Sequence, residues 1–473
     1  MDIKYVCKTL GKLLTFFSLV FVIPISVAIY YTEDFKPFLF SALTSALIGL
    51  IMCCVKSEME TPRYKEAFAV VSIGWLLVSV VGSIPYVLIG IKPIDAFFES
   101  MSGFTTTGAS VLTPELLPKS VLIWRSLTQW LGGMGIIVLF LAFFPSIAKS
   151  GVTLFQAEYT GITVLKVKPR LRDTVISLYL TYMFFTVLEI TVLKLLGVPI
   201  FDAINHAFTT LSTGGYSTHS ESISYFKDFR VEFAIAFFAA IGGMNFALLY
   251  YLLRGDLRIF RDPEFRLYIF LILLFTTILT ILNLKRFDFF NSFRYSIFQV
   301  ISIMTTTGYT TYDFDLWSDS ARFILLLLMF IGGCSGSTAG GIKVLRMYIL
   351  TKYSAQQVLR SAEPKTVRLT KYGDLTVKRE LIDSITTFFI LYIFIFIVST
   401  LIIALFGYDI VTSISASAAT LGNVGPGLGL AGASENYANF NDLVKLLLIF
   451  NMWVGRLEIF SVLAIFIPHF WRE

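Results

Sequence analysis

The sequence predicts an all-α polytopic membrane protein with ten transmembrane helices. The 473 residues are 56% hydrophobic and only 15% charged, and the mean hydropathy is +0.76. One soluble core cannot bury that much apolar surface. A spanning helix needs about 20 mostly apolar residues. Ten runs are suitable, at residues 13–30, 38–55, 67–91, 120–145, 174–196, 231–253, 267–284, 321–350, 381–406 and 441–467.

The basic residues orient these runs. With the N-terminus inside, the segments on the cytoplasmic side hold 25 of the 38 lysines and arginines, as the positive-inside rule requires. We therefore expect both termini in the cytoplasm. The net charge of +6 follows from this topology and from contact with membrane lipid, so no nucleic-acid partner is expected.

A threonine- and glycine-rich phrase occurs four times, each time after an apolar stretch too short to span. The copies are SGFTTTGASVLT from Ser102, TTLSTGGYSTHS from Thr209, SIMTTTGYTTYD from Ser302 and SAATLGNVGPGLG from Ser417. Aligned on Gly108, Gly214, Gly308 and Gly422, they are 106, 94 and 114 residues apart. A half-helix and loop between two full spans is typical of a re-entrant pore loop. The repetition predicts four membrane-pore-membrane units around a pseudo-fourfold pore.

Two neighbouring features repeat with these phrases. An acidic residue that could cap the half-helix lies 13, 12 and 13 residues before the glycine, at Asp95, Asp202 and Asp409, whereas the third copy has Arg294 near that place. The second run of each unit also carries a glycine-rich stretch. These stretches are LGGMG from Leu131, IGGMN from Ile241, IGGCS from Ile331 and WVGRL from Trp453.

Such loops suit the removal of water from a cation. Rings of backbone carbonyl oxygens can replace a hydration shell, and glycine reaches backbone conformations that aim carbonyls at one axis. Threonine and serine hydroxyls can satisfy the freed N–H groups. We therefore expect a selectivity filter. Its predicted residues are Thr106, Thr107, Gly108, Ser212, Thr213, Gly214, Thr306, Thr307, Gly308, Thr420, Leu421, Gly422 and Asn423.

A second candidate site lies in the run at 321–350, where GGCSGSTAGG from Gly332 to Gly341 has five glycines in ten residues. Each glycine disfavours helix by about 1 kcal/mol relative to alanine, so the run should be interrupted. Arg456, a charge deep in a span, should face a wet cavity or a partner. We predict a gate below the filter, formed by Gly332, Gly333, Gly336, Gly340, Gly341, Lys343 and Arg456. A kinked helix interface, and a structural pair of Arg456 with Glu458 or Glu189, remain open alternatives.

Together these motifs resemble the Trk/Ktr/HKT superfamily of cation transporters, and more closely its TrkH-type potassium uptake subunits of bacteria and archaea. The resemblance rests on the four filters, on GGCSGSTAGGIKVLR from Gly332 and on GRLEIF from Gly455, and it covers residues 67–467. It implies a homodimer in a prokaryotic inner membrane and a cytosolic Trk-type regulatory subunit. Nucleotide is then expected only on that partner, and no covalently bound cofactor is expected.

The resemblance also implies the transported ion. In this family, glycine at all four filter positions accompanies potassium selectivity. The implied potassium ligands are the carbonyl groups of Thr107, Gly108, Thr213, Gly214, Thr307, Gly308, Leu421 and Gly422.

The predicted organisation has five parts. They are an N-terminal two-helix extension at 1–60 and four pore repeats at 61–172, 173–264, 265–372, which includes the gating loop at 332–341, and 373–473.

Other functions fit parts of the sequence. A proton- or sodium-coupled potassium symporter needs polar coupling groups in the membrane, and Asn245, Glu189 and Glu458 could serve. An intramembrane serine protease could use Ser335, but it needs a histidine on a neighbouring span, and none of the three histidines lies in a predicted span. A structural or receptor protein would not need four filters. The sequence thus favours potassium uptake over an enzyme and leaves the mode of coupling open.

Overall fold

The computed structural model describes residues 1–59, 63–135, 171–363 and 369–471 of the chain. Its first two spans form an antiparallel pair. The first span consists of α1 (Ile3–Phe17), a short 3-10 turn (Ser18–Phe21) and α2 (Val22–Tyr30), and the second is α3 (Lys36–Cys53). Gly11 and Gly49 let the two backbones approach closely, because a Cβ on either one would press against the other's carbonyl oxygen.

Within the described residues, four similar groups of helices follow, called repeats below; each has a long helix, a short helix called the pore helix, and a second long element. The first contains α4 (Tyr64–Leu88), α5 (Pro93–Phe104) and α6 (Lys119–Gly133), and the second α10 (Leu171–Leu195), α11 (Ile200–Leu211), α12 (Phe229–Gly242) and α13 (Phe246–Leu253). The third contains α14 (Pro263–Asn283), α15 (Phe289–Met304), α16 (Asp319–Leu328) and α17 (Val344–Ala362). The fourth contains α18 (Arg379–Leu405), α19 (Ile410–Leu421), α20 (Asp442–Arg456) and α21 (Phe460–Ile465), before a last turn, α22 (Pro468–Trp471).

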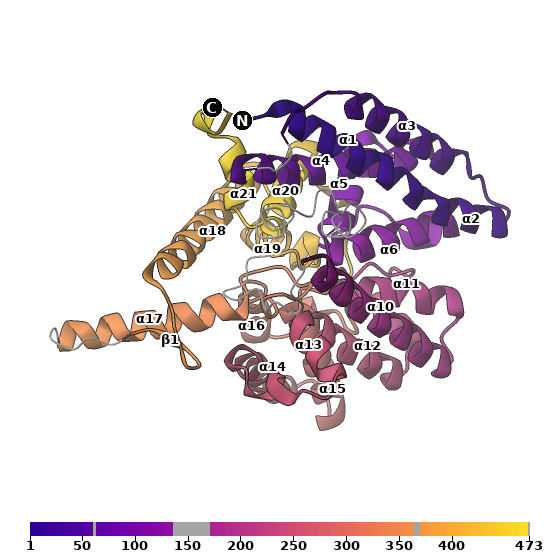
Figure 1. Ribbon diagram of the computed structural model, residues 1–473. Coiled ribbons are helices and arrows are strands. Elements are labelled where there is room, and N and C mark those ends of the chain that lie inside the picture. The colour runs from indigo at the N-terminus through magenta and orange to yellow at the C-terminus, as the bar shows by residue number, and fades with distance from the viewer. Residues whose placement is uncertain (60–62, 136–170, 364–368, 472–473) are drawn as a thin grey trace.

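The repeats surround a common centre in chain order. In Figure 1 the colour passes from purple through magenta and pink to yellow around the middle of the molecule. Helix α6 packs against α11, α12 against α15, and α20 back against α5. Met329, just after α16, lies against Gly422 at the end of α19. The second long element of each repeat therefore contacts the pore helix of the next repeat, and the fourth closes the ring on the first.

The structure confirms part of the predicted span count. Among the described residues, six helices are long and apolar enough to cross a membrane, and the pair α12 and α13, bent by 107°, makes a seventh if counted as one span. The predicted runs 120–145, 321–350 and 441–467 are not single helices within the described residues, because α6, α16 and α20 end at or near their glycine-rich stretches. Residues 136–145 of the first of these runs lie outside the described part.

The core lies between the pore helices and the long helices around them. Trp124 of α6 is completely buried and stacks on Phe21 with ring centroids 4.6 Å apart. Large apolar side chains also cover the outer surface, for example Leu43, Leu47 and Ile51 of α3. An apolar exterior around a well-packed interior is what a bilayer requires.

A small hairpin follows α17, which extends away from the ring in Figure 1. Strands β1 (Lys371–Tyr372) and β2 (Leu375–Thr376) pair antiparallel, with Lys371 opposite Thr376 and Tyr372 opposite Leu375.

The caps of the pore helices differ from the prediction in two repeats. Asp409 does cap α19, accepting the Thr412 N–H at 3.1 Å. In contrast, α5 begins at Pro93 and α11 directly after Pro199, and neither helix has a side-chain cap. Asp95 and Asp202 lie in the first helical turn. Proline presets the helical φ and needs no N–H partner there, so the acidic residues are available for other contacts.

The freed acidic groups hold neighbouring elements. The Asp95 carboxylate binds the Lys445 ammonium of α20 at 2.6 Å, and Asp202 accepts the Thr218 hydroxyl at 2.8 Å. In the third repeat, Asp288 is the cap of α15. Arg294, six residues further on, forms an ion pair with Glu232 of α12 at 2.6 Å.

Candidate functional site

Each pore helix ends in the same tight turn. The first residue past the helix C-cap is left-handed in all four repeats: φ is +53° at Thr106, +55° at Thr213, +58° at Thr306 and +54° at Asn423. The next N–H bonds to the carbonyl five residues back, at 2.8 to 2.9 Å, in all four copies. This is the Schellman arrangement, which glycine usually provides. A left-handed threonine or asparagine costs of order 1–3 kcal/mol, so four of them at one place indicate a constrained, functional segment.

A glycine two residues further on brings the four turns together. Its φ is +81° at Gly108, +75° at Gly215, +77° at Gly308 and +99° at Gly425. A Cβ on Gly108 would overlap the carbonyl oxygen of Gly214 in the next repeat, and a Cβ on Gly215 would overlap that of Thr307. Gly308 stands in the same relation to the Val424 oxygen, and Gly425 to that of Thr107. Each of the four turns therefore touches the next one, and together they form a closed ring.

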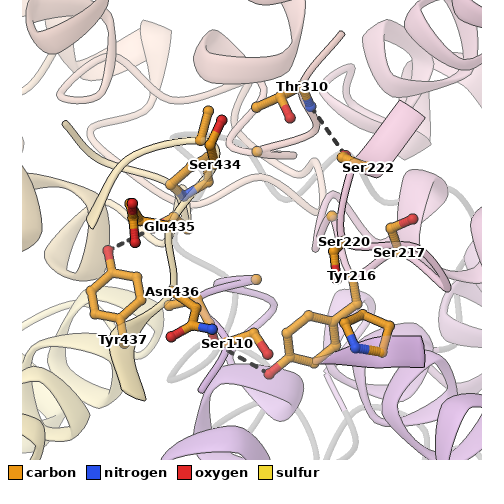
Figure 2. Close-up of a pocket in the computed structure, with 18 of the residues that line it drawn as sticks. Ser110, Tyr216, Ser217, Ser220, Ser222, Thr310, Ser434, Glu435, Asn436 and Tyr437 are labelled. Carbon is orange, nitrogen blue, oxygen red and sulfur yellow. Dashed lines mark hydrogen bonds between the residues drawn. The ribbon is translucent and has the colours of Figure 1, made fainter. Parts of the chain in front are cut away.

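The same four glycines line one cavity, which encloses about 150 Å³. One water needs only about 10–15 Å³ of such space, so a hydrated ion can enter. Figure 2 shows side chains from all four repeats around this vestibule, including Ser110, Tyr216, Thr310 and Tyr437. Glu435, at its rim, has an exposed carboxylate. The cavity leads from the molecular surface to the ring of glycines.

These positions correct two of the predicted anchors. Gly215 and Gly425, one and three residues after Gly214 and Gly422, are the structural equivalents of Gly108 and Gly308. Thr420 and Leu421 are the last residues of α19, and Gly422 and Ser212 are helix C-caps. The equivalent segments, called the filter loops below, are Thr106–Gly108, Thr213–Gly215, Thr306–Gly308 and Asn423–Gly425.

The register error has a simple cause. The second and fourth phrases contain more than one glycine, and the alignment on the first one shifted both copies. The tyrosine that follows Gly215 and Gly308 in GGY and TGY would have aligned them correctly. Gly215, Val424 and Gly425 were thus missed by the sequence reasoning.

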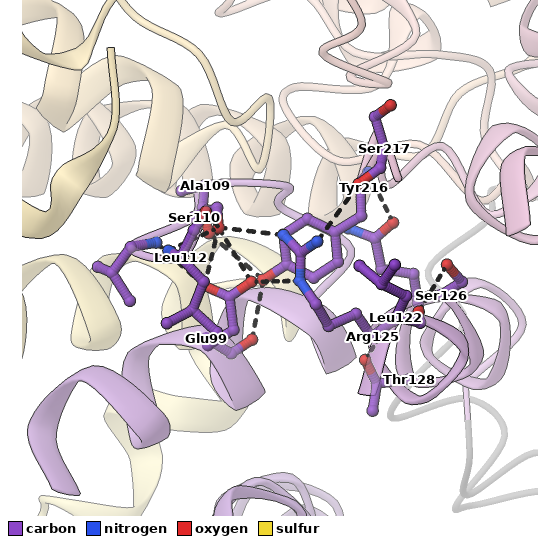
Figure 3. Close-up of polar contacts among 12 residues, drawn as sticks. Glu99, Ala109, Ser110, Leu112, Leu122, Arg125, Ser126, Thr128, Tyr216 and Ser217 are labelled. Atoms are coloured by element: carbon purple, nitrogen blue, oxygen red, sulfur yellow. Dashed lines mark hydrogen bonds and ion pairs between the residues drawn. The ribbon is translucent and has the colours of Figure 1, made fainter. Parts of the chain in front are cut away.

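A buried ion pair supports the first filter loop (Figure 3). The Arg125 Nε of α6 lies 2.8 Å from a carboxylate oxygen of Glu99 on α5, and their side chains are 2% and 0% exposed. Glu99 also accepts the Val111 N–H and the Ser110 hydroxyl, both at 3.0 Å, and the Arg125 guanidinium lies 4.3 Å from the centre of the Tyr216 ring. Sequence reasoning missed both charges, although each stands alone in an apolar stretch.

Neutral groups do the same work in the other repeats. Gln129 donates to the Gly214 carbonyl at 2.7 Å and accepts the Tyr216 N–H at 3.1 Å. Ser302 donates to the Tyr309 carbonyl at 2.6 Å, and Ser415 both donates to and accepts from the backbone of Leu428. Hydrogen bonds behind the loops thus hold each one.

The predicted interruption of the run at 321–350 is confirmed. Helix α16 ends at Leu328 and α17 begins at Val344. The two ends of the gating loop, residues 332–341, are joined by backbone bonds from the Gly332 N–H to the Ile342 carbonyl, at 2.7 Å, and from the Val344 N–H to the Gly333 carbonyl, at 3.1 Å. Lys343 donates to the Ala339 carbonyl within the loop.

The gating loop lies directly against the filter. The Gly340 N–H donates to the Thr306 hydroxyl at 2.7 Å, and Gly340 also lies against Gly422 and Asn423 of the fourth repeat. Thr338 donates to the carbonyls of Leu211 and Gly242 in the second repeat, both at 2.9 Å.

Arg456 joins this loop to the first repeat. Its guanidinium donates to the Thr338 carbonyl at 2.7 Å, and to the carbonyls of Gly132 and Gly133 at 2.7 and 2.9 Å. Glu458, one suggested partner of Arg456, forms an ion pair with Arg346. The gating loop therefore contacts the second, third and fourth repeats directly, and Arg456 links it to the first.

Comparison with known proteins agrees with this architecture. The family model TrkH, described as "Cation transport protein", matches residues 33–472. The chain belongs to the TrkH family. It is 37% identical to the Trk system potassium uptake protein TrkH of Salmonella typhimurium, with both chains covered in full, and 34% identical to TrkG of Escherichia coli K12, with 100% and 99% coverage. The crystal structure of the potassium transporter TrkH from Vibrio parahaemolyticus superposes with a TM-score of 0.90, at 34% identity over the whole of both chains.

TrkH-family membership decides the class of function. These relatives are named as transporters, so the chain is a multi-pass membrane transporter of the Trk potassium uptake family and not an enzyme. Two of the three histidines, His206 and His219, have structural contacts. The His206 ring bonds to the Asp202 carbonyl and the Ser217 hydroxyl, at 2.8 and 3.0 Å, and His219 stacks on Tyr225.

Proposed function

We propose that the chain carries potassium into the cell through the ring of four filter loops. The observation that carries this proposal is a closed cycle of contacts among the four filter loops. The last glycine of each loop lies against a carbonyl oxygen of the next loop, namely that of the residue just before its last glycine. Such a ring presents carbonyl oxygens from four directions to one axis, which is how a protein replaces the water around an alkali cation. The ligands are the carbonyl groups of Thr106–Gly108, Thr213–Gly215, Thr306–Gly308 and Asn423–Gly425.

Potassium is the proposed ion for two reasons. The relatives that match over their full length are named potassium uptake proteins. All four filter loops also end in glycine, so no side chain narrows the ring at that level. The driving force is a negative cell interior, worth roughly 2.3 kcal/mol per charge per 100 mV.

The gating loop and Arg456 form the proposed barrier. The loop lies on the axis on the side of the filter opposite the vestibule, and the permanent charge of Arg456 beside it repels a cation. Its donors also hold the Thr338 carbonyl. An open pathway requires this loop to move away from Thr306 and Asn423.

The vestibule faces the outside and the gating loop the cytoplasm in this proposal, with both termini cytoplasmic. A cytosolic nucleotide-binding regulatory subunit docks on the basic segment at 343–379, which carries nine lysines and arginines. Arg360, near the end of α17, is exposed there, whereas Lys365 and Arg368 lie outside the described residues. A homodimer in the bilayer completes the assembly.

Coupled symport is the second candidate. Of the three suggested coupling groups, Asn245 caps α13 and Glu458 pairs with Arg346. Glu189 of α10 is fully buried, and within the described residues neither of its carboxylate oxygens has a hydrogen-bond partner of good geometry, although Thr210 is close. A buried carboxyl of this kind could bind a proton during transport.

Reversal potentials of the purified protein in liposomes, under crossed potassium, sodium and pH gradients, test both candidates. We expect the potential to follow the potassium gradient. A potential that follows sodium equally would contradict the potassium filter, and a shift with the pH gradient alone, absent in Glu189→Gln, would favour proton coupling. In cells, the chain with its regulatory partner should restore growth of a potassium-uptake-deficient host at low external potassium.

A further inference from the structure

Glu264, near the start of α14, contacts both the gating loop and the helix that follows it, α17. Its side chain is 3% exposed. One carboxylate oxygen accepts the Ser335 N–H at 2.5 Å and the Leu345 N–H at 3.0 Å. Ser335 belongs to the loop and Leu345 to the first turn of α17. One acceptor atom therefore ties the loop to the helix that follows it.

This contact reinforces the closed ends of the loop. Two backbone hydrogen bonds already join residues 332 and 333 to residues 342 and 344. Glu264 adds a tie from a different helix and so fixes the position of these ends relative to α14. The loop cannot leave the filter as a unit with α17 unless the Glu264 contacts break.

The same end of α14 contacts the hairpin beyond α17. The carboxylate of Asp262, the helix cap, accepts the Phe265 N–H at 2.9 Å and the Tyr372 hydroxyl at 2.6 Å. Gly373, in the hairpin turn, lies next to Pro263. A displacement of α17 and its hairpin therefore pulls on residues 262–264.

We propose that Glu264 is a positioning residue for the gate. Its acceptor oxygen, with the N–H groups of Ser335 and Leu345, forms a clamp that keeps the gating loop against the filter until α17 and the β1–β2 hairpin move. This inference rests on the proposed function for its account of flux. The position of the loop can be tested separately.

Cys334 provides a reporter of that position. It lies in the gating loop next to Ser335 and is 2% exposed, so a charged methanethiosulfonate reagent reaches it only when the loop is displaced. The purified full-length protein in detergent, with Cys7, Cys53 and Cys54 replaced by serine, isolates this thiol. The labelling rate, followed by intact mass, then measures loop opening.

Glu264→Leu removes the acceptor and leaves side-chain volume in place. Two hydrogen bonds to that oxygen are lost, so Cys334 should label about tenfold faster, which corresponds to about 1.4 kcal/mol. Glu264→Gln keeps an acceptor oxygen and should stay within about twofold of the parent. Should Glu264→Leu not fold, Glu264→Asp withdraws the oxygen by one methylene and should also accelerate labelling.

Glu66 offers a matched control. It is a buried glutamate in the first turn of α4, and its carboxylate accepts the N–H groups of Asp2 and Arg63, both at 3.0 Å, far from the gating loop in sequence. Glu66→Leu should leave the labelling of Cys334 unchanged. Equal acceleration in Glu66→Leu, or parental labelling in a folded Glu264→Leu, would overturn the clamp.

Flux separates this inference from the proposed function. Faster labelling of Glu264→Leu together with faster potassium flux supports both. Faster labelling without faster flux supports the clamp and removes the loop from the barrier. Parental labelling and flux in Glu264→Leu, with raised flux in Arg456→Ala, would refute the clamp and leave the gate.

Discussion

The filter loops and the gating loop lie against each other on one axis but are held in different ways. Each filter loop has its own helix-ending turn and a set of hydrogen bonds behind it from its own or the neighbouring repeat. The gating loop does not continue from a pore helix. It is held by contacts from the second, third and fourth repeats, among them Arg456, which also reaches the first repeat, and Glu264. Each filter loop is thus fixed by the helix end that precedes it, whereas the gating loop is held by hydrogen bonds from surrounding elements, which must break before it moves.

The largest expected effect comes from adding a side chain inside the filter ring. Gly425→Ser places a Cβ against the Thr107 carbonyl at a left-handed position. The ring must deform there, so the potassium-to-sodium permeability ratio should fall at least about tenfold, a loss of about 1.4 kcal/mol in discrimination. Gly108→Ser should behave in the same way.

Gly422→Ser is the control for this register. Gly422 is a right-handed helix cap that faces Met329, not the vestibule. The Gly422→Ser substitution should lower the protein yield or the potassium flux. The potassium-to-sodium permeability ratio of the remaining current should stay near the parental value. A loss of selectivity in Gly422→Ser but not in Gly425→Ser would show that the original anchor was correct.

The next effect concerns release of the gating loop. Arg456→Ala removes three hydrogen bonds to carbonyl groups and a charge from the axis. Potassium flux in liposomes should rise about tenfold or more, because bonds to a charged group contribute about 1.5–3 kcal/mol each, while the permeability ratio stays unchanged. Arg456→Lys should be intermediate, since a single ammonium cannot match the planar fork. Reduced flux in both variants at equal protein content would argue against the barrier.

A smaller effect is expected from the support behind the first filter loop. Glu99→Gln leaves the buried Arg125 without its counter-charge, which costs about 3 kcal/mol in comparable cases. The thermal unfolding midpoint in detergent should fall, and selectivity should change less than in Gly425→Ser because Ser110 and Tyr216 still hold the loop. Asp228→Asn, which weakens the exposed pair with Arg230, should move the midpoint far less. Equal midpoints for the two variants would mean that the buried pair adds nothing.

The smallest effect belongs to the vestibule rim. The exposed negative charge of Glu435 raises the local cation concentration near the entrance at low salt. Glu435→Gln removes this charge. Potassium conductance should fall by less than about twofold in low-ionic-strength buffer and recover as added salt screens the charge. An effect of the same size at high salt would assign Glu435 a direct contact with the ion.

Much of this organisation was accessible from sequence because it is repeated or compositionally extreme. Four threonine-glycine phrases predicted the pore helices, and five glycines in ten residues predicted the broken helix at Gly332–Gly341. The isolated charge at Arg456 was correctly placed beside the loop. Each of these features depends on a local property, such as helix propensity or the cost of a charge in a bilayer.

The details that depend on neighbouring repeats were not accessible. The choice between Gly422 and Gly425 is made by a carbonyl that belongs to another repeat, which local spacing cannot report. Glu99 and Arg125 are 26 residues apart and meet only because α5 and α6 pack together. Asp95 binds Lys445 and does not cap its helix because α20 of the fourth repeat packs against α5 of the first, a contact between distant parts of the sequence.

Closure of the ring also bears on the order in which the protein is made. The last loop, through Gly425, meets Thr107 of the first, and α20 packs against α5. Synthesis proceeds from the N-terminus, so three filter loops enter the membrane before the fourth exists. A chain arrested before Gly425 lacks one wall of the ring, and its first loop has no neighbour on that side. A selective pathway therefore arises only as the final repeat is inserted, when α20, whose last residue is Arg456, also arrives.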